Sequence, residues 1–162
     1  MKPYIVFTGT HSTGKSTLVN AIKSFVDPDD SYVITGVSRF INKHYKLPVN
    51  EKSTIETQYK IEEIYDLLEK FHEDKIRMAD RSIIDRYAYS TYNKLPLEDY
   101  FKTMIPAKMS LYTHIFYIPP EIKLADDNFR SLDEDYRLAI DNIIKTKLDE
   151  CNIPYYIVHG SV

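Results

Sequence analysis

The chain has 162 residues, of which 43% are hydrophobic and 28% charged, and its 21 basic and 24 acidic residues leave a formal net charge of −3. This composition predicts one globular domain that buries about 70% of the surface of the unfolded chain. No apolar run is long enough to span a membrane, the N-terminal apolar stretch is too short for a signal peptide, and the single cysteine excludes an internal disulfide. We therefore expect a cytoplasmic protein with no membrane partner, and the balanced charge argues against binding of duplex nucleic acid.

The first part of the chain alternates strand and helix patterns. Residues 4–8 form a continuous apolar run that is typical of a buried parallel strand, and a helix is expected to begin near Lys15. Residues 32–35 predict a second strand. A helix is predicted over 53–71, because its first four residues, Ser-Thr-Ile-Glu, form a capping box with Ser53 as the N-cap.

The middle of the chain predicts a third strand and an interrupted helical stretch. Residues 76–80 form the strand, although Arg77 is unexpected in a sheet that is covered on both faces. The helical pattern extends over 84–108 and contains Pro96 and Pro106. We expect these two prolines to divide it into two or three helices, because proline lacks the N–H that a helix interior needs.

The last part of the chain completes the pattern. Residues 113–118 predict a fourth strand, a second capping box begins a helix at Ser131 that extends to about Leu148, and residues 154–158 predict a fifth strand. Five strands separated by helices imply right-handed crossovers and a three-layer α/β domain with a parallel sheet. No linker or repeat divides the chain, so we expect a single domain over 1–162.

A phosphate-binding motif lies between the first strand and the first helix. Residues 9–17, GTHSTGKST, satisfy G-x-x-x-x-G-K-[ST], whose glycines let backbone N–H groups turn inward toward phosphates at a helix N-terminus. The lysine supplies charge at the β- and γ-phosphates of ATP, and the serine hydroxyl that follows it can ligate Mg²⁺. His11 occupies a variable position, and an alternative is that its side chain simply faces solvent. The predicted ATP-binding residues are Gly9, Thr10, His11, Ser12, Thr13, Gly14, Lys15, Ser16, Thr17 and, from near the end of the chain, Arg137.

Charged residues follow the third strand, at the end of a parallel sheet where ligands bind. Asp80 can hold magnesium together with Ser16 or accept the proton of an attacking hydroxyl, and Arg81 can neutralise phosphate charge in the transition state. An N-cap role for Asp80 remains open. Asp85 and Arg86 are further candidates, for substrate binding. The alternative is that they only form the solvated start of a helix.

The segment after the fourth strand has the composition of a short lid. Residues 121–131 are polar and contain Arg130, and Arg137 follows about two turns later. Arginines on a mobile segment can close over phosphates and exclude water from the phosphoryl group. The alternative is that these arginines only face their acidic neighbours.

Arg39 and Gln58 are candidates for substrate binding in an acceptor pocket, in addition to Asp85 and Arg86. Arg39 lies beyond the second strand, where a second substrate would approach. Gln58 falls on the apolar side of its predicted helix, where a buried amide either contacts a base edge or bonds to the backbone. The chain also contains 14 tyrosines, none of which we assign to the pocket from the sequence.

Three segments resemble the short P-loop kinases that are related to the ribosylnicotinamide kinase domain and to nucleoside and nucleotide kinases. They are residues 9–17, the DRSIID segment at 80–85 and the NFRSLDEDYR segment at 128–137, and the resemblance extends in order over 3–158. It implies a P-loop NTPase fold with a five-stranded parallel sheet in the order 2-3-1-4-5. It also implies transfer of the γ-phosphoryl group of ATP, with Mg²⁺, to a small nucleoside or nucleotide.

The resemblance also assigns roles to residues, but it leaves two positions for the key carboxylate. By the first likeness Asp80 is the catalytic or magnesium-associated carboxylate, Arg81 is its phosphate-binding neighbour, and Arg130 and Arg137 are lid arginines. The DRYAYS segment at 85–90 is similar to the Asp-Arg-Tyr-x-x-Ser signature of thymidylate kinases, which would give Asp85 that role. We prefer Asp80, because it directly ends the predicted strand.

The sequence thus predicts an ATP-dependent phosphotransferase that acts on a small nucleoside or nucleoside monophosphate. Two alternatives remain, a kinase for the 5′-hydroxyl of nucleic acids and a nucleotide-dependent ATPase switch that acts on a protein partner. The sequence identifies neither the acceptor nor the oligomeric state, so a homodimer stays open.

Overall fold

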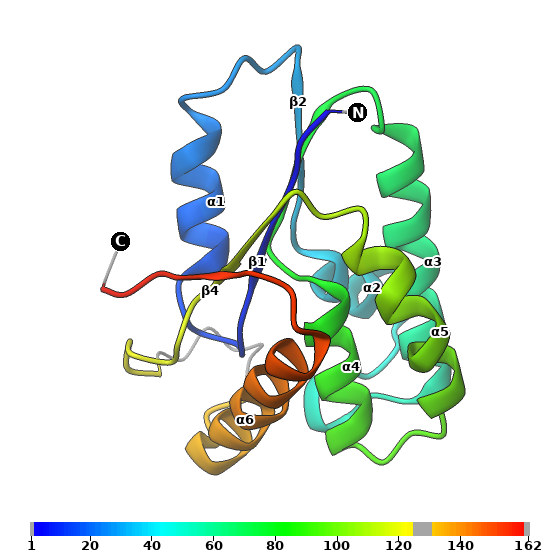
Figure 1. Ribbon diagram of the computed structural model, residues 1–162. Coiled ribbons are helices and arrows are strands. Elements are labelled where there is room, and N and C mark those ends of the chain that lie inside the picture. The colour runs from blue at the N-terminus through cyan, green and yellow to red at the C-terminus, as the bar shows by residue number, and fades with distance from the viewer. Residues whose placement is uncertain (1, 125–130, 161–162) are drawn as a thin grey trace.

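The computed structural model describes residues 2–124 and 131–160 (Figure 1). The elements in chain order are β1 Tyr4–Thr8, α1 Lys15–Lys23, β2 Ser31–Ile34, α2 Val37–Tyr45, the short 3₁₀ helix η1 Asn50–Lys52, α3 Ile55–Phe71, β3 Ile76–Ala79, α4 Ile83–Tyr92, α5 Glu98–Met109, β4 His114–Tyr117, α6 Glu134–Cys151 and β5 Tyr156–Ile157. Among these residues no helix has the length and apolar character that crossing a bilayer requires.

The five strands form one parallel sheet in the order β2-β3-β1-β4-β5, which confirms the predicted fold class. The central strand β1 pairs with β3 on one side and β4 on the other, so the loops after these three strands lie at the same edge of the sheet. The fifth strand is shorter than predicted, since only Tyr156 and Ile157 pair with β4.

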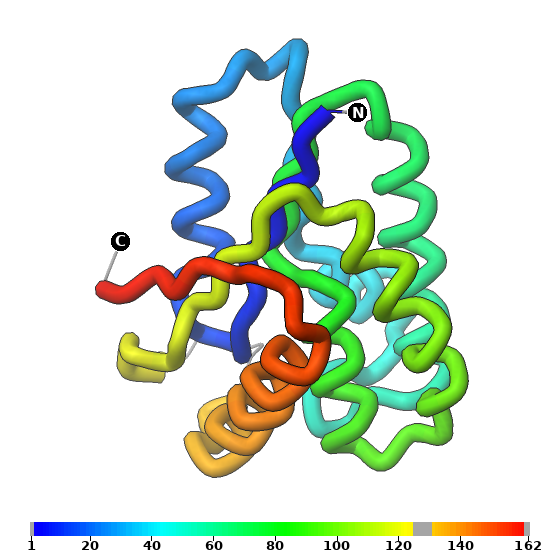
Figure 2. The backbone as a smooth tube through the Cα atoms, viewed as in Figure 1, coloured from blue at the N-terminus to red at the C-terminus, as the bar shows by residue number. Residues whose placement is uncertain are grey.

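Helices cover both faces of the sheet, as Figures 1 and 2 show. Alternation along β1 explains the two layers, because Val6 faces the larger core beneath α2–α6 and Phe7 faces the smaller core beneath α1. Val19 and Met78 complete the centre of the smaller core. Val6 and Phe7 are both almost fully buried, and their packing fixes the position of the loop that follows β1.

Four local expectations for the helices were wrong. α2 was not predicted, because Gly36 looked like a strand end, whereas it is the N-cap of this helix in a left-handed conformation with φ 71°. The N-cap of α3 is Thr54, whose capping box uses Thr57, and that of α6 is Asp133. Pro106 lies inside α5 and does not divide it.

Arg77 is tolerated in β3 because its side chain finds polar and aromatic partners. It is 4% exposed, its Nη1 donates to the carbonyl oxygen of Glu69 at 2.9 Å, and its guanidinium lies 4.6 Å from the ring centroid of Tyr4. Glu69 is in the last turn of α3, where carbonyl groups lack helical partners and the helix dipole favours a cation. Arg77 therefore stabilises the end of α3 from within the sheet.

Candidate active site

The loop between β1 and α1 requires glycine at two positions. Gly9 has φ 147°, and a Cβ atom at this position would lie 2.4 Å from the carbonyl oxygen of Ile118, the residue after β4. Gly14 has φ 88° and is the N-cap of α1, where no side chain caps the helix. The loop thus packs directly against the neighbouring strand and leaves the N–H groups of the first helical turn available to an anion.

A polar pocket lies at this helix N-terminus. Its lining residues are His11, Ser12, Thr13, Gly14, Lys15, Ser16, Thr17, Asp80 and Arg81. Lys15 is 6% exposed, and its Nζ donates to the carbonyl oxygen of Thr10 and, at 3.1 Å, to Oγ1 of Thr13. The lysine side chain is therefore folded over the loop, and its charge lies in this pocket.

Asp80 reaches this pocket from the end of β3. The hydroxyl of Ser16 donates to Oδ2 of Asp80 at 2.5 Å, and the carboxylate is 7% exposed. Both are hard oxygen donors of the kind that Mg²⁺ prefers. Within the described ranges no group of three or more His, Cys, Asp or Glu side chains is arranged to hold a metal ion, so a Mg²⁺ ion here would need further oxygens from phosphates and water.

Asp85 has a different environment and lines neither this pocket nor the next one described. It is fully buried, and its carboxylate accepts hydrogen bonds from Oγ1 of Thr8 at 2.6 Å, the N–H of Gly9 at 3.0 Å and the N–H of Ser82 at 2.7 Å. The bond from Ser82 belongs to the capping box of α4. Asp85 therefore ties the start of the phosphate loop to α4, whereas Asp80 is the carboxylate that lines the pocket.

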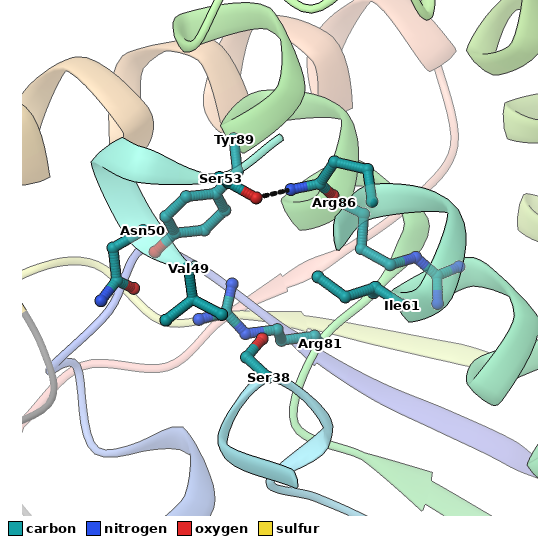
Figure 3. A pocket seen from close by; sticks show the side chains of 9 residues that line it. Ser38, Val49, Asn50, Ser53, Ile61, Arg81, Arg86 and Tyr89 are labelled. Carbon is teal, nitrogen blue, oxygen red and sulfur yellow. Dashed lines mark hydrogen bonds between the residues drawn. The ribbon is translucent and has the colours of Figure 1, made fainter. Parts of the chain in front are cut away.

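A second pocket adjoins the first (Figure 3). It is lined by Ser38, Val49, Asn50, Ser53, Gln58, Ile61, Arg81, Arg86 and Tyr89. Arg81 lines both pockets, so the two meet at its side chain. Although burial opposes its charge, the oxygens of Tyr89, Asp85 and Asp80 hold the pKa of the Arg81 guanidinium above its ordinary value, and the group stays cationic.

Gln58 and Arg86, which both line the second pocket, have buried hydrogen-bonding groups without partners. Nε2 of Gln58 donates to Oγ of Ser53 at 2.7 Å, whereas its Oε1 is buried without a partner. Arg86 is 2% exposed, its Nε lies 3.0 Å from Oε1 of Glu62, and its Nη1 and Nη2 atoms are buried without hydrogen-bond partners. Burial raises the pKa of the Glu62 carboxyl, and Arg86 opposes this shift.

The other arginines among the predicted site residues are Arg137, Arg39 and Arg130. Arg137 is 1% exposed, and its Nη2 donates to the carbonyl oxygen of Ile122 at 2.7 Å and lies 3.5 Å from that of Ser12 in the phosphate loop. Arg39 is exposed on α2 and lines neither pocket, whereas its neighbour Ser38 lines the second one. Arg130 and most of the expected lid lie outside the described residues.

A family model described as an AAA domain matches residues 4–162, and this match covers nearly the whole chain. The chain belongs to this AAA domain family. The same family carries the P-loop, and the structural neighbours place it among the P-loop kinase-like folds. No curated protein sequence matches the chain.

The fold of this AAA domain is shared by solved structures of NadR proteins and of a thymidylate kinase. A NadR protein in complex with NR has a TM-score of 0.76 at 20% identity over 99% of this chain, and a NadR protein in complex with NAD and AMP-PNP has 0.71 at 18% over 98%. The chain covers only 46% and 45% of those two proteins. A thymidylate kinase from Ehrlichia chaffeensis, of which it covers 88%, has a TM-score of 0.64 at 12% identity over 99% of this chain. This likeness shows the fold.

Sequence reasoning missed Tyr89 and underestimated His11. His11 is 3% exposed, so its side chain does not face solvent, and its Nδ1 lies 3.2 Å from the hydroxyl of Tyr89 in the second pocket. The His11 ring also lies 5.5 Å from that of Tyr136, in the first turn of α6. The sequence contains 14 tyrosines, and helical spacing does not distinguish Tyr89 from the others. The contact of Tyr89 with His11 depends on how α4 packs beside the loop.

Proposed function

We propose that this AAA domain is a Mg²⁺- and ATP-dependent phosphotransferase that phosphorylates a small nucleoside or nucleoside monophosphate. The observation that carries the proposal is the position of Arg81, which lines both the phosphate-loop pocket and the pocket that contains Gln58 and Arg86. A donor in the first pocket and an acceptor in the second would meet at this cation. The shared fold with NadR and thymidylate kinase structures supports the same activity class.

The donor side rests on the phosphate loop. The N–H groups at the start of α1 and the ammonium of Lys15 would hold the β- and γ-phosphates, and Arg137 beside Ser12 would face them from α6. Ser16 and Asp80 would hold Mg²⁺, which when bound neutralises phosphate charge. Arg130 stays a proposed lid residue.

The proposed reaction is an in-line transfer between the two pockets. The acceptor oxygen, which is a hydroxyl oxygen of a nucleoside or a phosphate oxygen of a nucleoside monophosphate, forms a bond to the γ-phosphorus while the bond from that phosphorus to the β–γ bridging oxygen breaks, and ADP leaves. Where the acceptor is a hydroxyl, Asp80 orients it and takes its proton. Lys15, Arg81 and Arg130 stabilise the charge on the transferred group.

We expect the second pocket to select its acceptor by hydrogen bonding. Buried groups without partners are costly, so a bound acceptor is expected to fill them. Oε1 of Gln58 needs a donor, and the two Nη atoms of Arg86 need acceptors. A molecule with a donor and an acceptor group side by side, such as the amide edge of a base, meets both needs.

The second pocket must open before an acceptor binds. Its free volume is about 20 Å³, which is room for roughly one water molecule. One wall comes from α2 and the segment before α3, through Ser38, Val49 and Asn50, so we expect this wall to move outward. A pocket of this size suits a small acceptor better than an oligonucleotide.

The experiment incubates the protein with γ-labelled ATP, Mg²⁺ and a panel of nucleosides, nucleoside monophosphates and a 5′-hydroxyl oligonucleotide. We expect label on a small acceptor and none on the oligonucleotide. Label on the oligonucleotide alone would assign the nucleic-acid kinase activity instead. ATP hydrolysis that no acceptor changes, with label on none of them, would contradict the proposal and favour an ATPase switch.

A further inference from the structure

Tyr89 holds the Arg81 side chain where the two pockets meet. Cζ of Arg81 lies 4.6 Å from the centroid of the Tyr89 ring, and Figure 3 shows both side chains in the second pocket. Asp80 and Asp85 act on the Arg81 guanidinium through their charge, and among the described residues the ring of Tyr89 is its close side-chain contact. Arg86 and Arg137, by contrast, have carboxylate or carbonyl partners. The aromatic face is thus the direct contact that restrains this guanidinium.

The ring of Tyr89 is itself fixed from the phosphate loop. Tyr89 is 5% exposed, and its hydroxyl lies within hydrogen-bond distance, 3.2 Å, of Nδ1 of His11. His11 is 3% exposed and its ring lies 6.5 Å from that of Tyr89. A histidine in the phosphate loop therefore sets the position of a ring that belongs to the acceptor pocket.

From these contacts we infer that Tyr89 is a positioning residue for Arg81, with His11 as its anchor in the phosphate loop. This inference rests on the proposed function, since it concerns how Arg81 meets the transferred phosphoryl group. A free arginine side chain loses much rotamer entropy when it is immobilised, and the ring reduces that cost before the substrates bind. Tyr89 would then act on the rate of transfer more than on ATP affinity.

The test measures transfer from γ-labelled ATP to the acceptor that wild-type protein labels fastest. Tyr89→Leu removes the ring, and we expect kcat to fall about tenfold with KM for ATP within about twofold of wild type. Tyr89→Phe keeps the ring but loses the hydroxyl that meets His11, so its kcat should fall by about threefold, between wild type and Tyr89→Leu. Tyr92→Leu is the matched control, because Tyr92 is on the same helix, packs on Tyr136 at 4.8 Å and lines neither pocket.

A double-variant comparison separates positioning from loss of structure. In an Arg81→Met background, Tyr89→Leu should change kcat by less than about twofold, because no guanidinium is left to position. An equal loss in both backgrounds, or an equal loss in Tyr92→Leu, would overturn the inference. If circular dichroism shows that Tyr89→Leu does not fold, Tyr89→Met takes its place.

A second readout needs no turnover. The Nε–Hε signal of Arg81 in a ¹⁵N-labelled sample should carry a ring-current shift in wild type and Tyr89→Phe that is absent in Tyr89→Leu. An Arg81 signal unchanged by loss of the ring would overturn the contact. Wild-type protein that labels no acceptor would contradict the proposed function instead, and the shift would still report on the contact.

Discussion

Asp85→Asn tests whether this carboxylate supports the fold rather than the chemistry. The carboxylate is fully buried and accepts bonds from Thr8, Gly9 and Ser82 at 2.6–3.0 Å. Asparagine is nearly isosteric, but its Nδ2 would face donors that need an acceptor. Hydrogen bonds to charged groups contribute about 1.5–3 kcal/mol each, and an unsatisfied buried N–H costs a similar amount, so we expect a loss of about 3 kcal/mol in the free energy of unfolding.

The assay is urea unfolding followed by circular dichroism in the absence of nucleotide. In thermal unfolding, the same loss corresponds to a decrease in Tm of about 6–12 °C for a chain of this length. Asp80→Asn is the control, because Asp80 accepts only from the Ser16 hydroxyl among the described side chains, and its stability should stay within about 1 kcal/mol of wild type. Asp85→Asn with wild-type stability and no transfer activity would refute the reasoning and give the catalytic role to Asp85.

Three further substitutions have defined outcomes. Lys15→Ala should abolish transfer with unchanged circular dichroism, and activity above about 1% of wild type would contradict its role. Gly9→Ala should lower the free energy of unfolding in urea by more than about 2 kcal/mol, because its Cβ would clash with the Ile118 carbonyl. Gly36→Ala, with open space around it and φ 71°, should lower it by about 1 kcal/mol. Equal losses in the two variants would argue against the close approach of Gly9 to Ile118. Arg77→Met should lose about 1–3 kcal/mol through the unpaired carbonyl at the end of α3, and an equally stable variant would show that this contact contributes little.

The sequence predicted the parts of the fold that local chemistry determines. The apolar run of β1 and the glycine-containing loop correctly predicted a strand, a loop and a helix start, because these three are contiguous in the chain. The strand order followed from the resemblance of those segments to P-loop kinases. The positions of Ser16 and Asp80 at one pocket follow from that order, since β3 lies beside β1.

Local signals were insufficient where several residues compete for one role. Ser53 and Thr54 are both good N-caps, and the structure uses Thr54, whose partner Thr57 also donates to the carbonyl oxygen of Pro48. α2 begins at a glycine and has no side-chain cap, so its start carries no sequence signature. In both cases tertiary packing decides among alternatives that are nearly equal in local energy.

The second pocket depends on contacts between distant segments. Gln58 was a candidate because its amide falls on an apolar helix face, and the structure places it in the second pocket. Arg39 was a candidate by position in the chain, but α2 turns it outward to the surface. Tyr89 could not be singled out, because its role depends on α4 lying beside the phosphate loop.

Transfer of label from γ-labelled ATP to a small nucleoside or nucleoside monophosphate, compared between wild type and Asp80→Asn, tests the central claim most directly. The account predicts transfer by wild type, and a loss of at least about 100-fold in kcat for Asp80→Asn, with ATP affinity and stability retained. Full transfer activity in Asp80→Asn, or hydrolysis of ATP by wild type with no label on any acceptor, would contradict it.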